Sequence, residues 1–115
     1  MAKRNMTTVI FALTGTAWAL TVSEAFAAED LSRLAAGQRL VEQNCARCHA
    51  VTRSGDSPHP QAPPFRTLSS RYPVAQLEEA LVEGLSTGHP DMPEFIFSTD
   101  NAAAIIAYLK SIQSK

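Results

Sequence analysis

Two cysteines and a histidine within residues 45–49 are the side chains whose types and spacing could do chemistry. They read C-x-x-C-H, with Cys45, Cys48 and His49. Two thiols three positions apart on a helical turn can each add to one vinyl group of a single porphyrin, and the adjacent imidazole can bind the iron. The motif therefore predicts one covalently attached haem c, with His49 as an axial ligand of the iron.

Two other chemistries use such a pair of cysteines. A redox disulfide of the thioredoxin kind needs a strand-to-helix setting, whereas the flanking residues here have a helical pattern. A zinc site needs further ligands, and only His59 and His89 remain, both in proline-rich loops without a second paired motif. The histidine that directly follows Cys48 favours haem over both alternatives.

The N-terminal residues have the pattern of an export signal. Lys3 and Arg4 precede an apolar run at 9–22, and a small-x-small cleavage site, A-F-A, follows. The run is too short and too weak for a membrane span, the alternative being an uncleaved anchor. We therefore expect residues 1–27 to be a cleaved signal peptide and residues 28–115 to form one domain in the periplasm.

A second axial ligand is expected on the other face of the iron. Met92 is the one methionine beyond the signal segment, and it lies in a proline-flanked loop. A neutral, soft thioether in this position gives an electron-transfer centre of raised potential, whereas an open position allows dioxygen or peroxide chemistry. We predict Met92 as the ligand. His89 is the rival, because it would give a bis-histidine site, and His59 is a weaker rival.

Charge excludes one class of partner. The whole chain has 10 Lys plus Arg and 11 Asp plus Glu, and removal of Lys3, Arg4 and Glu24 with the signal leaves 8 and 10. A net charge of −2 on the remaining polypeptide is far from the basic surface that nucleic-acid binding requires.

Apolar residues recur with helical spacing in three stretches. We expect helices at 31–45, 74–85 and 100–114, with a short helical turn at 65–70. Asp30 is a plausible N-cap of the first helix, and Ser98 or Thr99 of the last. The predicted inward-facing residues are Leu31, Leu34, Leu40, Val41, Val74, Leu77, Leu81, Leu85, Ile105, Ile106, Leu109 and Ile112. No alternating strand of useful length occurs, so the predicted class is all-α with long loops.

These features together resemble the class I c-type cytochromes of the short bacterial kind. The resemblance covers nearly all of residues 28–115. It rests on the C-x-x-C-H motif, a proline-rich loop, the segment 88–93 with its Met-Pro pair, and the closing amphipathic helix. It implies a cytochrome c-like fold of three main helices and long loops wrapped around one haem. Cys45 and Cys48 would carry the thioethers, with His49 and Met92 as axial ligands.

The resemblance also implies finer contacts. The first and last helices would cross tightly where Gly37 meets Tyr108. A proline carbonyl, that of Pro63 or Pro64, would accept a hydrogen bond from the ring of His49. Candidates for contacting the haem propionates are Arg66, Arg71 and Tyr72.

The chain departs from the mitochondrial pattern in two respects. It has no tryptophan beyond the signal segment and no ring of lysines to steer docking. The positive charges nearest the attachment motif are Arg47 and Arg53, which suggests a smaller, mixed docking patch around the exposed haem edge.

We therefore expect a soluble, monomeric periplasmic electron carrier rather than an enzyme. It would shuttle single electrons between a dehydrogenase or a quinol-oxidising complex and a terminal oxidase or reductase, through brief encounters. One alternative is a dedicated cytochrome subunit of one periplasmic dehydrogenase, docked through an apolar patch at residues 95–97. Another is an open-site, ligand-binding or peroxidatic haem protein in which Met92 is not on the iron.

Overall fold

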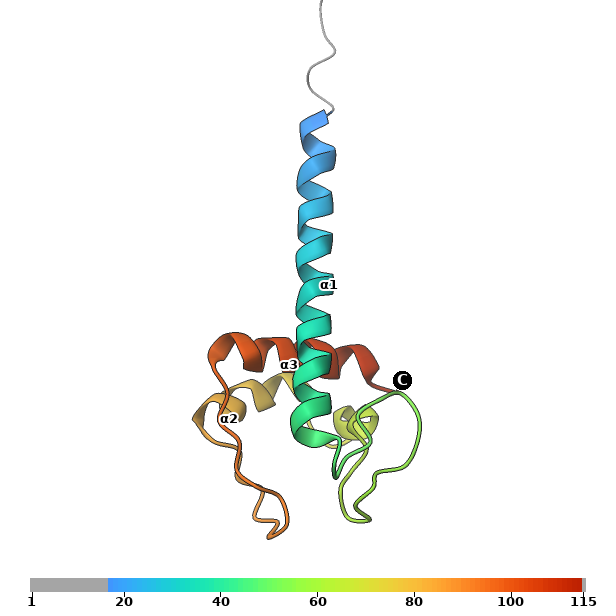
Figure 1. The fold of residues 1–115 in the computed structure, drawn as a ribbon, viewed down its shortest axis with the longest axis vertical. Coiled ribbons are helices and arrows are strands. Elements are labelled where there is room, and N and C mark those ends of the chain that lie inside the picture. Colours follow the sequence, from blue (N-terminus) through green and yellow to red (C-terminus); the bar gives the residue numbers. More distant parts are fainter. Residues whose placement is uncertain (1–16, 115) are drawn as a thin grey trace, which may run out of the picture.

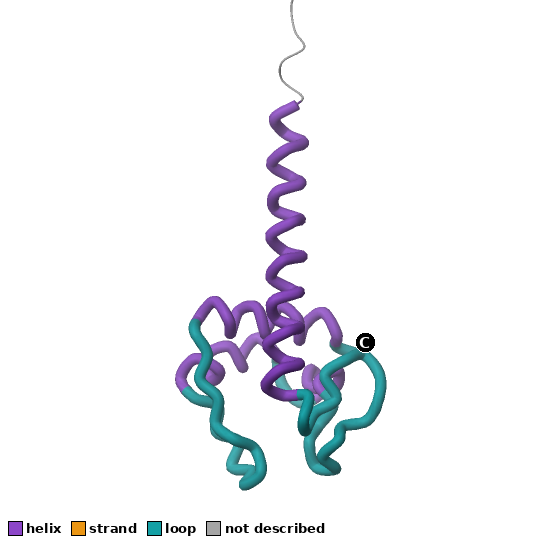
Figure 2. Tube along the Cα trace, viewed as in Figure 1, coloured by secondary structure: helices purple, strands orange, loops and turns teal. Residues whose placement is uncertain are grey.

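The structure is a computed structural model that describes the backbone of residues 17–114 and the side chains of residues 24–114. It has three α-helices, α1 (Ala17–Cys45), α2 (Leu77–Glu83) and α3 (Thr99–Ile112). Two short 3-10 helices, η1 (Phe65–Ser70) and η2 (Val74–Gln76), lie between α1 and α2. Long loops make up most of the remainder (Figures 1 and 2). Over the described residues no strand occurs beyond an isolated bridge between Leu85 and Phe95, so the predicted all-α class is confirmed.

Helix α1 is longer at its N-terminal end than the sequence pattern predicts. It begins at Ala17 rather than near Leu31, and its N-terminal half projects away from the rest of the fold (Figure 1). Phe26 and Leu31 are 66% and 67% exposed, so the prediction that Leu31 faces inward is wrong. Asp30 lies inside the helix and is not its N-cap.

The extension has a local cause. Residues 25–28 are rich in alanine, the strongest helix former, and residues 17–36 contain neither glycine nor proline. Tertiary packing begins only near Leu34, which is half-buried. The charged start of the predicted signal, Lys3 and Arg4, lies outside the described residues, and cleavage after residue 27 stays a prediction.

Helices α1 and α3 cross at Gly37, and this crossing is the centre of the fold. A Cβ atom on Gly37 would lie 2.6 Å from the carbonyl carbon of Ala104 and 2.9 Å from the Cβ of Tyr108. Val41, one turn further along α1, is completely buried. The tight contact that the family resemblance implies between Gly37 and Tyr108 is therefore present, and only a residue without a side chain permits it.

Helix α3 supplies most of the core. Ser98 caps its N-terminus, because the Ser98 hydroxyl accepts a hydrogen bond from the backbone N–H of Asn101 at 3.3 Å. Tyr108 is buried, and its hydroxyl donates to the carbonyl of Val51 at 2.8 Å, which ties α3 to the chain after the C-x-x-C-H motif. The predicted stripe of this helix is confirmed, since Ile105, Ile106, Leu109 and Ile112 are all buried.

The segment predicted as one helix at 74–85 is divided. It begins as η2 and continues as α2, which ends at Glu83. Gly84 follows with a φ of 118°, a backbone conformation that residues with side chains rarely adopt. Val74 and Leu81 are buried against α3, whereas Leu77 and Leu85 are half-buried at the edge of the same core. The turn predicted at 65–70 is confirmed as η1.

Two long loops leave this helical core on the same side. One runs from the end of α1 to η1, and the other runs from α2 to α3; both extend to the lower end of the view in Figure 1, on either side of the C-terminal end of α1. None of the helices in the described part of the chain is both long enough and apolar enough to span a bilayer.

Candidate haem site

The C-x-x-C-H motif forms a compact turn at the end of α1. Cys45 is the last residue of the helix, and its carbonyl accepts hydrogen bonds from the backbone N–H of Cys48 at 3.1 Å and of His49 at 2.9 Å. Both thiols are free and half-buried. The turn thus presents two thiols and an imidazole within five residues, as attachment of one porphyrin requires.

Burial makes Cys45 a weak acid. Desolvation, and to a lesser degree the neighbouring Cys48, raises the pKa of the Cys45 thiol from 9.0 to about 11. The thiol is therefore protonated at neutral pH in the polypeptide without haem. An uncharged thiol or thioether suits such buried surroundings better than a thiolate does.

The ring of His49 is held from two sides. Its Nδ1 lies 2.8 Å from the carbonyl oxygen of Pro63. Because that oxygen can only accept, Nδ1 carries the proton and donates, and Nε2 keeps its lone pair free for a metal. Phe65 packs on the same ring, with centroids 4.5 Å apart. The choice between Pro63 and Pro64 is thus settled in favour of Pro63.

The loop that follows the motif is bonded back to it. The backbone N–H of His59 donates to the carbonyl of Cys48 at 3.0 Å, and that of Phe65 donates to the carbonyl of Ala50 at 2.9 Å. The hydroxyl of Ser57 accepts from the N–H of Ala50 at 3.0 Å. These bonds fix the position of Pro63, and through it the orientation of the His49 ring.

Met92 is half-buried in the loop between α2 and α3. The loop is closed at its base by the bridge in which the N–H of Leu85 donates to the carbonyl of Phe95 at 3.2 Å. At its tip the N–H of Met92 donates to the carbonyl of His89 at 3.1 Å, and the hydroxyl of Thr87 donates to Sδ of Met92 at 3.6 Å. The thioether is therefore presented on a short, internally bonded turn.

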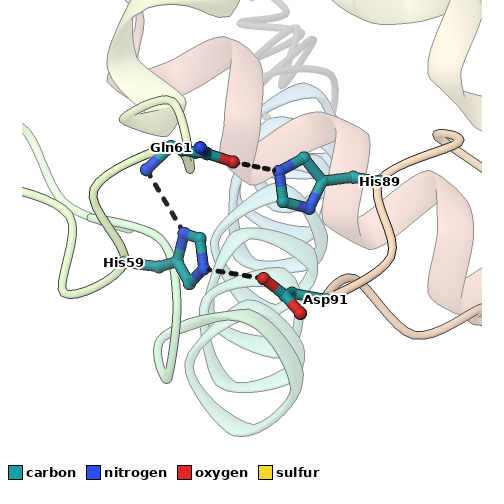
Figure 3. Close-up of polar contacts among 4 residues, drawn as sticks. All are labelled: His59, Gln61, His89 and Asp91. Atoms are coloured by element: carbon teal, nitrogen blue, oxygen red, sulfur yellow. Dashed lines mark hydrogen bonds and ion pairs between the residues drawn. The ribbon is translucent and has the colours of Figure 1, made fainter.

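The two rival histidines are engaged with other side chains. His89 Nε2 bonds Gln61 Oε1 at 2.7 Å, and His59 Nε2 bonds Asp91 Oδ2 at 3.3 Å (Figure 3). His59 Nδ1 also accepts a hydrogen bond from the backbone N–H of Gln61 at 3.2 Å. A rotation of either ring toward an iron atom would break these contacts, which favours Met92 as the ligand.

The donor set fits a haem. Two unpaired thiols can form the covalent bonds to the porphyrin, and an imidazole with a free Nε2 and a neutral thioether are axial ligands that a c-type centre uses. No group of three or more His, Cys, Asp or Glu side chains within the described residues is arranged to hold a metal ion, so Cys45 and Cys48 lack the companion ligands of a tetrahedral zinc site there.

The other candidate residues have varied surroundings. Arg66 donates from Nη1 to the carbonyl of Gly55 at 2.6 Å, and Arg71 and Tyr72 are exposed. Arg66 thus braces the first loop, and propionate contacts by these three residues stay a prediction. In the segment 95–97, Ile96 is 69% exposed. The flanking Phe95 and Phe97 are half-buried, and their rings stack with centroids 6.0 Å apart.

Sequence reasoning missed several residues around this site. Three contacts could not be predicted from the sequence pattern. They are those of Phe65 with His49, Thr87 with Met92, and Gln61 with His89. Only the contact of Thr87 with Met92 had a signal in the sequence, because these two residues are five positions apart. Gln61 and His89 are 28 residues apart, and nothing local connects them.

Comparison with known families places the chain in one of them. The family model described as cytochrome c matches residues 34–113, which is more than half of the chain, and the chain belongs to that family. The match begins at Leu34, where α1 first packs on the core. No curated protein and no solved structure was found to match the chain.

Membership of the family defines the cofactor and the class of activity. Members bind a covalent haem c, and Cys45 and Cys48 fit the attachment motif. The chain is therefore a haem-carrying electron-transfer protein and not an enzyme in the usual sense.

Proposed function

We propose that this protein is a soluble single-electron carrier of the periplasm, with one haem c whose iron is bound by His49 and Met92. The observation that carries the proposal is the His49 ring. Its Nδ1 is committed to the Pro63 carbonyl at 2.8 Å, directly after two free thiols at haem-attachment spacing. Such a hydrogen bond fixes the tautomer and increases the basicity of the metal-binding nitrogen.

Each residue has a distinct task in this proposal. The haem, when bound, supplies a one-electron ferric/ferrous couple. His49 stays oriented by Pro63 and Phe65 in both oxidation states, so little rearrangement is needed there. Met92 contributes a neutral, soft donor that favours the ferrous state and thereby raises the potential. The two long loops on either side of the C-terminal end of α1 would cover a bound haem and limit its contact with water.

Partners would dock briefly at an exposed haem edge. Arg47 is exposed between the two attachment cysteines, and Arg53 is exposed nearby, where its guanidinium bonds the carbonyl of Ser111 at the end of α3. We infer a small docking patch of mixed charge for an acidic surface on a redox protein. Double neutralisation, Arg47→Gln with Arg53→Gln, should flatten the salt dependence of electron transfer to such a partner. An unchanged dependence argues against the patch.

The ligation is tested by absorption spectroscopy of the protein matured with covalent haem. Ferric wild-type protein should show the weak near-infrared sulfur-to-iron band, and Met92→Ala should lose it. His89→Gln is the matched control, because it removes the rival ligand while keeping a hydrogen-bonding side chain, and the band should persist. A high-spin wild-type spectrum, or a band indifferent to Met92, would reject His–Met ligation.

Export is tested separately. Mass spectrometry of the protein recovered from a periplasmic fraction should give a mature chain that begins at Ala28 and carries one haem. Recovery of an intact N-terminus in the membrane fraction would favour the uncleaved anchor instead.

A further inference from the structure

Four side chains link the two loops that flank the haem site. His59 and Gln61 belong to the loop after the C-x-x-C-H motif, and His89 and Asp91 belong to the turn that carries Met92. Figure 3 shows the two pairs facing each other across the two loops, His89 with Gln61 and His59 with Asp91. We name these four residues the loop clasp.

The hydrogen bonds of the loop clasp assign one role, donor or acceptor, to each ring nitrogen that takes part. His59 Nδ1 accepts the backbone N–H of Gln61 at 3.2 Å, so in the neutral ring Nε2 carries the proton and donates to Asp91 Oδ2 at 3.3 Å. Gln61 Oε1 can only accept, so His89 Nε2 is the donor of the 2.7 Å bond. The two imidazole rings meet edge to face with centroids 5.7 Å apart.

Both ends of the loop clasp are anchored next to the haem ligands. On one side the N–H of His59 donates to the carbonyl of Cys48 at 3.0 Å, and the N–H of Ala62 donates to the carbonyl of His59 at 3.1 Å. The next residue is Pro63, the acceptor for His49. On the other side the carbonyl of His89 accepts from the N–H of Met92 at 3.1 Å. A short chain of hydrogen bonds therefore connects the loop that holds His49 to the turn that carries Met92.

We propose that the loop clasp is a positioning device that keeps the Met92 thioether on the iron. The inference rests on the proposed His–Met ligation. A ligand on a loop competes with water and external ligands through its effective concentration at the metal, and a loop that is restrained near its tip has a higher effective concentration. The bridge between Leu85 and Phe95 holds the loop at its base. The loop clasp supplies the second restraint, close to Met92.

Each contact of the loop clasp is partly exposed, which sets the size of the effect. The side chains of His59 and Asp91 are 29% and 66% exposed, and Gln61 is exposed. Hydrogen bonds in contact with water contribute less than buried ones, so we expect each to change the equilibrium between bound and displaced Met92 by about threefold. Loss of both should change it by about tenfold.

The test is a titration of ferric haem-loaded protein with imidazole at pH 7, because imidazole must displace Met92 in order to bind. Gln61→Ala and Asp91→Ala should each lower the imidazole Kd about threefold, and the double variant about tenfold. Gln61→Glu and Asp91→Asn keep an acceptor oxygen at each position and should retain a Kd close to that of the wild type. This rescue distinguishes the lost hydrogen bond from a general loosening of the loop.

Gln38→Ala is the matched control. Its side chain donates to Glu42 at 2.8 Å on the exposed face of α1, so it loses a hydrogen bond of the same kind away from both loops, and its imidazole Kd should not move. If the loop-clasp variants bind imidazole with the wild-type Kd while the wild type has its Met92-dependent near-infrared band, the loop clasp does not position Met92. A wild-type spectrum without that band overturns the ligation and the loop clasp together, so the two failures can be told apart.

Discussion

The crossing of α1 and α3 allows a sharp test, because a single methyl group added at Gly37 should reverse the usual effect of alanine in a helix. In a helix interior, glycine to alanine normally stabilises by about 1 kcal/mol. At Gly37 the new Cβ would instead lie 2.6 Å from the carbonyl carbon of Ala104 and 2.9 Å from the Cβ of Tyr108. Both are closer than carbon atoms can approach without repulsion.

The expected loss in the free energy of unfolding depends on which groups must move to make room for the new methyl group. The contacts with Ala104 are to backbone atoms of α3, which no rotation of a side chain can relieve, so the helices must separate. Overpacking of a well-packed core costs typically 1–3 kcal/mol, and we take about 3 kcal/mol here because the clash is with backbone. Subtracting the gain in helix propensity, about 1 kcal/mol, leaves a net loss of about 2 kcal/mol. For a domain of this size that lowers Tm by about 10 °C.

The assay is denaturant unfolding of the ferric, haem-loaded protein, followed by circular dichroism. Ala35→Gly is the paired control, because Ala35 is exposed on the same helix and reports helix propensity alone, with an expected loss of about 1 kcal/mol. Gly37→Ala should be the less stable of the two variants. A Gly37→Ala protein as stable as the wild type, or more stable, would refute the close crossing.

Three further predictions concern groups near the site. Burial, followed by repulsion from Glu42, raises the pKa of Tyr108 above 10.0. The stabilisation that the protonated hydroxyl gives is therefore complete below pH 10 and declines as pH rises beyond it. Tyr108→Phe should lower the free energy of unfolding by about 1 kcal/mol at pH 7, and that free energy should depend less on pH above pH 10 than in the wild type. Thr87→Val removes the hydroxyl that donates to the sulfur of Met92. Under the proposed His–Met ligation the thioether should become a better donor to ferric iron, and redox titration should give a potential lower by about 20–40 mV, the equivalent of a weak hydrogen bond. In the polypeptide without haem, the pKa of about 11 at Cys45 should make its alkylation by iodoacetamide at pH 8 far slower than that of an unstructured cysteine peptide, and equal rates would show that the thiol is not buried.

Local patterns determined much of the fold. The C-x-x-C-H motif lies within one turn, so its three side chains are close together in any helical setting, and the sequence alone identifies it. The stripe of α3 and its Ser98 cap could be predicted because both depend on residues three or four positions apart. The predicted helix at 74–85 runs slightly too far, because α2 ends at Glu83 and Gly84 follows with a φ of 118°.

The beginning of α1 shows the limit of that reasoning. A periodic apolar pattern indicates which face of a helix is available for burial, but it does not say where the neighbouring element ends. Leu31 continues the pattern, yet the N-terminal half of α1 projects away from the rest of the fold (Figure 1), and Leu31 is 67% exposed. Asp30 has the chemistry of an N-cap and nevertheless lies mid-helix, because the alanine-rich residues before it also favour helix.

What the sequence by itself determined is therefore one haem-attachment motif and three amphipathic helical stretches, and it predicts Met92 as the sulfur donor. What only the tertiary structure decided is how the parts are held. The choice of Pro63 over Pro64, the packing of Phe65 on His49 and the pairing of Gln61 with His89 all join residues 14 to 28 positions apart in the chain. Contacts across such distances depend on how two long loops close, and loop closure is set by the whole core to which both loops are attached rather than by any local preference.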